Sequence, residues 1–485
     1  MSLTQRCWLT LVALVVGLVP VLVIMASRPS EPTAAVAGAL TRGAGGVGDP
    51  YLPLAGGGGY DVQHYDVRVQ ADPPGSTLTG TTTITAVASQ DLDVLNLDLA
   101  LTASQVLVDD IPAKLEQAGD QVSVTAARLN PSQPAIGAGS TFTVTVEYSG
   151  APDQAAPAAR AFYRADDEFV IAGEPQGATL WYAASDHPRD PATMRFAISV
   201  PDGIEAIAAG RLITEGDDPD DEARHRWVWQ VDAPTVTYAT FLAVGQYRLE
   251  RGIADGRPFV NVVSESLTSA EQARALRWLR RTPAAITHLE KYLGPYPFSG
   301  TGGFVSAAEF GWGGLETAMR PVYNKYLVGS ETLLNHELAH MWLGDTVTLQ
   351  DWNDIFDNES LATYAEWLTT SDSDPAREFR VGYYGNVGDA AFWGPALSDP
   401  GVEHMFERVY DRGPLVVHAL RTRMGDAAFF AVLKAWAQQR GPRSLEQFRA
   451  MADEATADDL TAFFAEWLDQ TDRPEATAEN GVPGR

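Results

Sequence analysis

Apolar and polar residues alternate along the first large part of the chain, beginning at Tyr60. Segments such as YDVQHYDVRVQ, TLTGTTTITAV, QVSVTAA and TFTVTVEYSG show this period of two, and clusters of Gly, Pro, Asp and Ser separate them. Such alternation is typical of strands that bury one face, and the turn residues favour short connections between neighbouring strands. The pattern therefore predicts an antiparallel β domain over residues 60–250.

The period changes to that of a helix in the next region, residues 251–372. Thr268 and Glu271 fit a capping box, which starts a helix by satisfying its free backbone N–H groups. Apolar residues then recur at helical spacing up to YLGPYPF, where glycine and proline end the pattern. These apolar positions are Leu276, Leu279, Ile286, Leu289 and Leu293. A short strand-like insert near GGFVSA is the one interruption that we expect in this helical region.

Residues 373–485 have the pattern of short helices that pack together. The segments GPLVVHALRTRM, AAFFAVLKAWAQQ and LTAFFAEWLDQ are amphipathic at helical spacing. The chain is therefore predicted to be an α+β multidomain protein, with an N-terminal antiparallel β domain, an α/β region over residues 251–372 and a short helical region at its end.

The first 59 residues differ from all that follows. The run CWLTLVALVVGLVPVLVIMA, residues 7–26, has no charge and reaches the length that spans a bilayer. Small residues suited to signal-peptide cleavage, around Ala35 and Ala37, lie well downstream, so an uncleaved anchor is favoured over a cleaved signal. Residues 27–59 are rich in Ala, Gly and Pro and are expected to be a linker. We expect an extracytoplasmic protein, membrane-anchored or secreted after cleavage.

Charge and cysteine content narrow the classes of partner and site. The formal net charge of −28 would repel phosphate backbones, which argues against a nucleic-acid partner. The single cysteine, Cys7, lies in the apolar leader, so the rest of the chain has neither a disulfide nor a thiolate metal site. A bound metal ion must therefore be held by histidines and carboxylates. The sequence does not indicate an oligomeric state.

The segment NHELAHMWLGD contains the motif HExxH, at His336, Glu337 and His340. On a helix, the two histidines lie one turn apart on the same face, so both imidazoles can reach one ion. Glu337 is turned aside, where it can act as a general base on water without ligating the metal. Two ordinary histidines on a helix remain the alternative, because two imidazoles are too few for a tight zinc site.

A third ligand is available in the segment DWNDIFDNESLATYAEWL. Glu359 stands at the start of a helical pattern there, and eighteen residues, 341–358, separate it from His340. Two histidines and one glutamate with an open fourth position are the arrangement of hydrolytic zinc sites. The alternative for Glu359 is a carboxylate that stabilises a helix N-terminus. The motif and Glu359 together favour one Zn²⁺ per chain, held by His336, His340 and Glu359.

This spacing resembles the gluzincin metallopeptidases, specifically the aminopeptidase N and leukotriene hydrolase family, and implies a thermolysin-like α/β catalytic domain. The family's Gly-x-Met-Glu-Asn motif is matched by Gly313-Gly314-Leu315-Glu316-Thr317, which replaces its Met and Asn. By this resemblance, Glu316 binds the free α-amino group of a peptide, and the backbone at Gly313 and Gly314 runs along the substrate as an edge strand.

Two further matches add candidate residues. ERVYDRGPLVVHALR is similar to the family's Val-Tyr-x-Lys-Gly segment, which makes Tyr410 the residue that stabilises the tetrahedral oxyanion and puts Arg412 at the frequent lysine. GEPQGATLWYAASDHP parallels a stretch of the family's N-terminal domain, where Glu174 falls on a second amine-binding glutamate. Asp186 and His187 in this stretch are interpreted as structural. Because only residues 360–485 follow Glu359, we expect most of the large C-terminal helical domain of many relatives to be absent and the cleft to be more open.

The resulting hypothesis is a zinc-dependent aminopeptidase that removes N-terminal residues from peptides with a free amine, with Glu337 and Tyr410 as its catalytic residues. A thermolysin-like zinc endopeptidase is one alternative, because HExxH with a downstream glutamate is common to both. Glu316 argues against it, since an internal peptide bond offers no amine. A catalytically inactive surface binding protein on the same fold is the other alternative, and the presence of every ligand and catalytic group argues against that.

Overall fold

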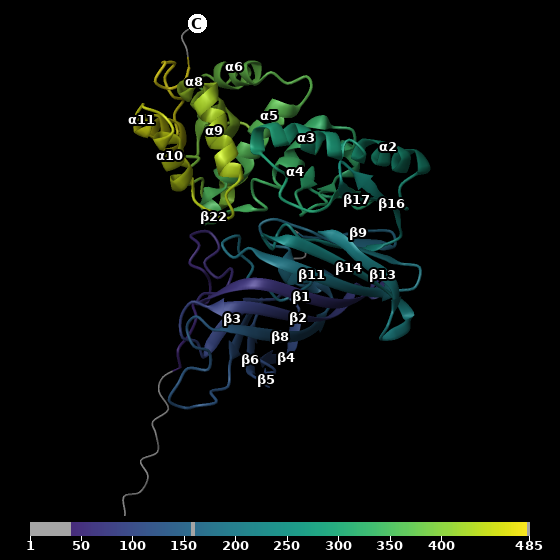
Figure 1. The fold of residues 1–485 in the computed structure, drawn as a ribbon. Coiled ribbons are helices and arrows are strands. Elements are labelled where there is room, and N and C mark those ends of the chain that lie inside the picture. Colours follow the sequence, from purple (N-terminus) through teal and green to yellow (C-terminus); the bar gives the residue numbers. More distant parts are fainter. Residues whose placement is uncertain (1–39, 157–160, 483–485) are drawn as a thin grey trace, which may run out of the picture. The chain divides into compact units, whose positions relative to one another are not determined.

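The computed structural model describes residues 40–156 and 161–482 of the chain. The apolar run 7–26, Cys7 and the start of the expected linker lie outside the described residues. Within the described residues, no helix is both long and apolar enough to cross a membrane. Figure 1 shows strands through the first half and most of the helices in the second half, as the periodicity predicted.

An eight-stranded sheet forms the largest part of the N-terminal region, in the order β13-β14-β11-β1-β2-β8-β4-β5. Its strands are β1 (Tyr60–Asp72), β2 (Thr77–Ala88), β4 (Thr102–Val108), β5 (Ile111–Pro112), β8 (Thr141–Gly150), β11 (Ala192–Pro201), β13 (Arg211–Asp218) and β14 (Asp221–Thr235). Its neighbouring strands are antiparallel except β1 and β11, which pair in parallel. The sheet is therefore mixed, with one parallel pair among antiparallel pairs. The long stretch of chain between β1 and β11 lets β11 return beside β1 in the same direction.

Two smaller sheets complete the β domain. One has the order β3-β7-β6 and the other β12-β15-β10-β9. Their strands are β3 (Val94–Asp98), β6 (Lys114–Ala118), β7 (Gln121–Thr125), β9 (Phe162–Ala165), β10 (Glu168–Ile171), β12 (Glu205–Ala208) and β15 (Leu242–Gly245). All four residues of β10 are buried, so this strand lacks the alternation of a half-exposed strand. The loop after β10 carries a residue of the candidate site.

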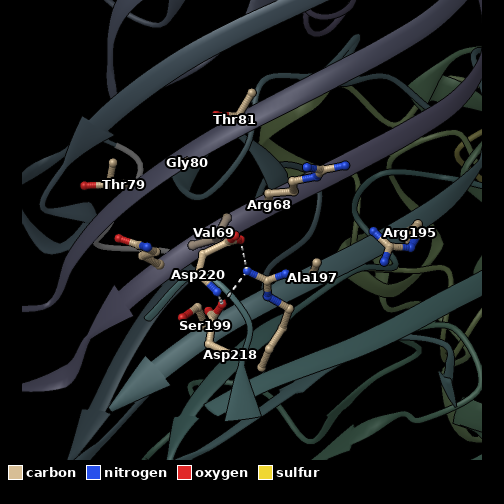
Figure 2. Close-up of a pocket in the computed structure, with 12 residues that line it drawn as sticks. Arg68, Val69, Thr79, Gly80, Thr81, Arg195, Ala197, Ser199, Asp218 and Asp220 are labelled. Carbon is tan, nitrogen blue, oxygen red and sulfur yellow. Dashed lines mark hydrogen bonds and ion pairs between the residues drawn. The ribbon is translucent and has the colours of Figure 1, made fainter. Parts of the chain in front are cut away.

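The exposed side of the eight-stranded sheet has a shallow hollow of about 400 Å³ (Figure 2). Arg226 in its wall pairs with Asp220 at 2.5 Å, and Arg68 and Arg195 share Asp66 at 3.4 Å. The charges of these arginines are thus balanced by carboxylates of the same surface. The hollow lies apart from the candidate catalytic residues.

Residues 40–59 are not the free tether that their composition predicted. Gly43 N donates to Val94 O at 2.8 Å, and Ala55 is buried. Asp49 is also buried, and its carboxylate accepts a hydrogen bond from Trp352 N at 2.7 Å. The prediction was wrong for these residues because the segment packs through its backbone and one carboxylate, which needs few large apolar side chains.

A five-stranded sheet begins the second region, in the order β16-β17-β18-β20-β19. Its strands are β16 (Tyr247–Ala254), β17 (Arg257–Ser264), β18 (Thr301–Val305), β19 (Gly314–Leu315) and β20 (Val322–Tyr323). The expected boundary at residue 250 falls inside β16, which pairs along its whole length with β17. Within residues 251–372 the sequence indicated only β18. β19 and β20 have two residues each, too few to show a period of two, and the second half of β17 is buried without alternation.

The helix expected between residues 269 and 293 is two helices, α2 (Ser269–Leu279) and α3 (Thr282–Leu293). The predicted capping box is present, with Thr268 N donating to Glu271 Oε2 at 2.9 Å. Pro283 explains the break, since it has no N–H and its ring would collide with the carbonyl of Leu279 in a continuous helix. In its place at the start of α3, the proline is tolerated.

The remaining helices and one small sheet build the region that holds the candidate metal ligands. The helices are α4 (Glu331–Ala339), α5 (Leu361–Thr369), α6 (Pro375–Gly385), α7 (Ala390–Trp393), α8 (Gly413–Met424), α9 (Asp426–Ala437), α10 (Leu445–Glu454) and α11 (Thr461–Phe464). Short π-helical turns cover Phe356–Ser360 and Ala465–Asp469. Strands β21 (Val347–Leu349) and β22 (Gly441–Arg443) pair in parallel. The three C-terminal segments predicted as helices correspond to α8, α9 and α11 with its π-helical extension.

Candidate active site

The two histidines of HExxH lie at the end of α4, as the spacing predicted. Ser330 caps the start of this helix by accepting a hydrogen bond from Leu333 N at 3.1 Å. His336 lies within the last turn and His340 is the C-cap residue. Their Nε2 atoms are 3.0 Å apart, so both imidazoles point at the same place.

Glu359 completes the set from a different element. It lies in the π-helical turn before α5 and is 2% exposed. Its Oε2 is 3.3 Å from Nε2 of both His336 and His340. A π-helical turn is rare and often found at functional sites, because it rotates one side chain out of the regular helical order. The structure thus brings together the three residues that the sequence predicted as metal ligands.

These three residues fit a zinc ion. Two imidazole nitrogens and one carboxylate oxygen are donors that zinc prefers, and ligand atoms about 2 Å from one tetrahedral ion are about 3.3 Å apart. The separations of 3.0 and 3.3 Å match that spacing. Burial alone would raise the pKa of Glu359, yet the positive charges and hydrogen bonds of His340 and His336 hold it below its usual range. The Glu359 carboxylate is therefore ready to ligate a cation.

Each histidine has an acceptor on its outer ring nitrogen. Nδ1 of His340 donates to Asn358 Oδ1 at 2.7 Å and to Leu343 O at 2.8 Å. Nδ1 of His336 lies 3.3 Å from Glu366 Oε2. These acceptors hold a proton on Nδ1 of each ring, so that loss of the Nε2 proton leaves a lone pair there for a metal. Sequence reasoning missed Asn358 and Glu366, although Glu366 follows Glu359 by two helical turns.

Glu337 lies beside this cluster, under the edge of the five-stranded sheet. It is 4% exposed, and a methyl group on Gly314 would collide with its carboxyl group. A side chain at this position of β19 would push the Glu337 carboxyl group aside, and glycine lets the backbone approach the candidate base. Burial raises the pKa of Glu337 to about 8, against the opposing positive charge of His336. β19 is an edge strand, as the resemblance implied for Gly313 and Gly314.

Glu316 and Glu174 meet at one end of the site, from opposite regions of the chain. Glu316 directly follows β19, and Glu174 follows β10 of the β domain. One carboxylate oxygen from each, together with one from Glu359, lies within 4.8 Å of the others. Oε1 of Glu316 and Oε1 of Glu174 are buried without a hydrogen-bond partner. Burial, followed by the negative charge of Glu316, raises the pKa of Glu174. Such a pair fits a buried cationic group.

Tyr410 lines the same cavity, and its ring centre is 5.9 Å from that of His336. The neighbouring Arg412 is fully buried. Its guanidinium donates to the carbonyls of Trp393, Pro395, Trp467 and Gln470, the last at 2.8 Å. Arg412 therefore fixes the segment that carries Tyr410 against the C-terminal residues, which a lysine with its single nitrogen would do less fully.

All nine predicted site residues line one cavity of about 630 Å³. Its wall beyond the glutamates is largely apolar, with side chains that include Trp312, Leu333, Trp367 and Phe406. The cavity thus has an acidic end, a histidine–carboxylate centre and an apolar remainder. Sequence reasoning missed these apolar residues because they come from separate loops and helices.

A second histidine–carboxylate cluster, formed by Asp49, His187 and Asp351, lies outside this cavity. Its members also have ligand atoms within 4.8 Å of one another. Arg189 contacts Asp351 through Nη2, so a guanidinium already neutralises that carboxylate. This contact supports the interpretation of His187 as structural.

The chain is similar to known peptidases over most of its length. Residues 323–467 match the peptidase family M1 domain. An aminopeptidase N from Streptomyces lividans is 27% identical over 323 residues, covering 59% of this chain and 36% of that protein. The chain thus spans well under two thirds of the length of this relative.

Solved structures cover more of this chain, and more of their own length, than the aminopeptidase N from Streptomyces lividans does. An M1 zinc metallopeptidase from Deinococcus radiodurans has a TM-score of 0.78 and 25% identity, covering 91% of this chain and 100% of that chain. A structure of the Deinococcus radiodurans M1 zinc metallopeptidase bound to a Tyr-Ser-Ala substrate has a TM-score of 0.76 and 26% identity, covering 89% of this chain and 99% of that chain. Because these neighbours are zinc enzymes and the three ligands here fit zinc, Zn²⁺ is the metal. The geometry and these matches make the chain similar to the aminopeptidase N-like gluzincins of peptidase family M1.

Proposed function

We propose that this chain is a zinc-dependent aminopeptidase that removes residues from the free N-terminus of peptides. The observation that carries the proposal is the pair Glu316 and Glu174, whose partnerless oxygens lie beside Glu359. A protonated α-amine is the group that such a pair would bind, because it supplies the hydrogen bonds and the positive charge that both carboxylates lack. The amine would then be held next to the metal ligands.

The backbone of β19 would orient the rest of the substrate. This edge strand presents unpaired backbone groups, and a peptide can add to it as a further strand. Gly314 keeps the strand close to Glu337, so the scissile bond would lie between the base and the histidines. Binding at the amine and along the strand fixes the reacting carbonyl, which lowers the entropic part of the barrier.

The chain's own groups would then move protons and stabilise charge. Glu337 takes a proton from the attacking water and returns it to the leaving amine as the C–N bond breaks. Tyr410 donates a hydrogen bond to the oxyanion that develops on the carbonyl. When bound, Zn²⁺ supplies a Lewis acid that polarises the carbonyl and lowers the pKa of water.

The cavity also supports a preference among peptides. The acidic end would repel acidic side chains, and the apolar wall at Trp312, Leu333 and Phe406 would favour apolar ones. We therefore expect peptides with apolar residues near the N-terminus to be cleaved faster than peptides with acidic residues there.

The test is hydrolysis of aminoacyl anilides by the zinc-loaded full chain, each compared with its N-acetylated twin. We expect cleavage of the free-amine substrates alone, with loss on chelation and recovery with zinc. Glu337→Gln should keep zinc and lose about 10²- to 10⁴-fold in kcat. Equal cleavage of the acetylated twins would instead indicate an endopeptidase, and zinc-loaded chain inert to both would indicate a binding protein.

We also propose that the enzyme works outside the cytoplasm. The uncharged run at residues 7–26 supports this location, whether it anchors the chain or is removed. The test is fractionation of cells that express the full chain. Activity in the membrane or secreted fraction is expected, and activity confined to the cytosolic fraction would contradict the proposal.

A further inference from the structure

A tyrosine of the β domain reaches the metal centre without belonging to the predicted site. Tyr238 lies between β14 and β15 and is 1% exposed. Its hydroxyl oxygen accepts a hydrogen bond from Asn358 Nδ2 at 3.1 Å. The other end of the same amide, Asn358 Oδ1, accepts from His340 Nδ1 at 2.7 Å. A chain of two hydrogen bonds thus joins the β domain to a metal ligand.

The Asn358 amide and the Leu343 carbonyl together set which way His340 faces. Within the amide, Oδ1 accepts the Nδ1 proton, and a reversed amide would set Nδ2 against that N–H group. With Oδ1 in place, the Nδ1 proton is fixed and the Nε2 lone pair points at His336 and Glu359. Asn358 is fully buried, so its amide has no water to replace a lost partner.

The surroundings of Tyr238 favour its role as an acceptor from Asn358. Burial first, and then the negative charges of Glu316 and Glu174, raise the pKa of its hydroxyl. The hydroxyl oxygen accepts from Asn358 Nδ2 and keeps its own hydrogen free to point elsewhere. This arrangement opposes reversal of the amide, because a reversed amide would need the hydroxyl as a donor.

Two further features fix the position of this pair. The Tyr238 ring packs against Trp352, with ring centres 5.6 Å apart. Gly344 has φ +119°, and a methyl group there would collide with Asn358 Oδ1 and lie 3.2 Å from the Tyr238 hydroxyl. The glycine of the segment HMWLGD therefore provides the space in which the amide and the phenol meet. Neither residue can move far without disturbing the other.

We propose that Tyr238 is a positioning residue of the metal centre, which holds the Asn358 amide in the orientation that presents His340 to zinc. The β domain would then contribute to metal binding as well as to amine binding through Glu174. This inference concerns zinc affinity and does not require peptide cleavage, so its failure and the failure of the proposed aminopeptidase are distinguishable.

The test is the zinc affinity of Tyr238→Phe in the full chain, measured by competition with a chelator. The replacement keeps the ring and leaves Asn358 Nδ2 without its acceptor. We expect zinc affinity to fall about 10- to 100-fold, the usual effect of removing an outer-sphere partner. The visible spectrum of the Co²⁺-loaded chain should change as well, since it reports ligand geometry.

Tyr182→Phe is the matched control. Tyr182 is also fully buried in the β domain, and its hydroxyl lies 3.3 Å from Thr240 Oγ1, two residues from Tyr238 in the chain. It should lower thermal stability without changing zinc affinity or the Co²⁺ spectrum. An equal loss of zinc affinity in both variants would overturn the proposal, because burial of any hydroxyl would then explain it.

Asn358→Ala provides the second variant and completes a double-mutant cycle. It should weaken zinc binding by itself, and adding Tyr238→Phe should then have little further effect. Wild-type zinc affinity in Asn358→Ala, or an undiminished effect of Tyr238→Phe in that background, would overturn the proposal. Because Asn358→Ala leaves Tyr238 in place, it tests the relay even where Tyr238→Phe does not fold.

Discussion

Two clusters among the described residues combine histidine with carboxylates at similar distances, and only one of these two fits a metal ion. In the cluster of His336, His340 and Glu359, the acceptors lie on Nδ1 and the Nε2 atoms face one another. At His187 the arrangement is reversed, because Nδ1 accepts from Arg189 N at 3.0 Å. The proton of His187 therefore lies on Nε2.

That proton is already used within the second cluster. Nε2 of His187 donates to Asp49 Oδ2 at 3.0 Å, so no lone pair points at Asp49 or Asp351. The comparison shows that proximity of ligand-type residues does not define a metal site. The outer hydrogen bond of each imidazole decides whether the ring offers a lone pair or an N–H group.

The largest expected effect separates the two clusters directly. His340→Ala should reduce bound zinc from one ion per chain to a small fraction, because two remaining ligands hold zinc weakly. His187→Ala, prepared in the same way, should keep its zinc. Metal analysis after dialysis against a mild chelator measures both. Loss of zinc in His187→Ala would show that the second cluster supports the metal.

A smaller loss of zinc is expected from the outer partner of His336. Glu366→Leu removes the acceptor on Nδ1 and should weaken zinc binding about 10- to 100-fold. Chelator competition measures the change. Glu366→Gln, which retains an oxygen acceptor, is the control and should lose less. Unchanged affinity in Glu366→Leu would mean that the Nδ1 proton needs no protein acceptor.

The second cluster should affect stability instead of metal binding. His187→Ala removes a buried ring and leaves one oxygen of Asp49 with one fewer donor. The free energy of unfolding should fall by about 2 to 4 kcal/mol. Thermal unfolding of the zinc-free chain measures this loss, with Glu366→Leu as the comparison. A larger loss of unfolding free energy in Glu366→Leu than in His187→Ala would contradict the structural role given to the cluster of His187.

The smallest expected effect is on how the stability of the chain depends on pH. Burial alone would raise the pKa of Asp49, but hydrogen bonds from His187, Trp352 N and Leu52 N lower it to about 2. A lowered pKa in the folded state contributes stability above about pH 4, and this contribution is lost as pH falls toward 2. Asp49→Asn should therefore be less stable at neutral pH and lose less between pH 4 and pH 2. Thermal unfolding at each pH measures the two proteins. An equal loss of stability between pH 4 and pH 2 in wild type and Asp49→Asn would contradict this prediction.

The sequence predicted the parts of this molecule that short-range patterns determine. Alternation indicated the strands of the β domain, and the spacing of His336, His340 and Glu359 indicated the metal ligands. The resemblance implied an edge position for Gly313 and Gly314, and the sheet order agrees for Gly314, which begins β19.

The parts that sequence reasoning missed depend on partners far along the chain. Asn358 is visible beside Glu359, but its second partner Tyr238 is 120 residues away. Arg412 stood in the sequence as a substitution without a reason, because its four carbonyl partners belong to separate segments. Residues 40–59 were misassigned since their composition says nothing about backbone pairing or the acceptor role of Asp49.

The short distance between the glutamates and the metal ligands has a consequence for the products. One oxygen each of Glu174, Glu316 and Glu359 fits within 4.8 Å, and one residue of extended chain spans about 3.3 to 3.6 Å. In the proposed aminopeptidase, a seated amine thus leaves room for a single residue before the cut. Each shortened peptide carries a fresh amine and can enter again, so a time course should show a ladder of products that differ by one residue.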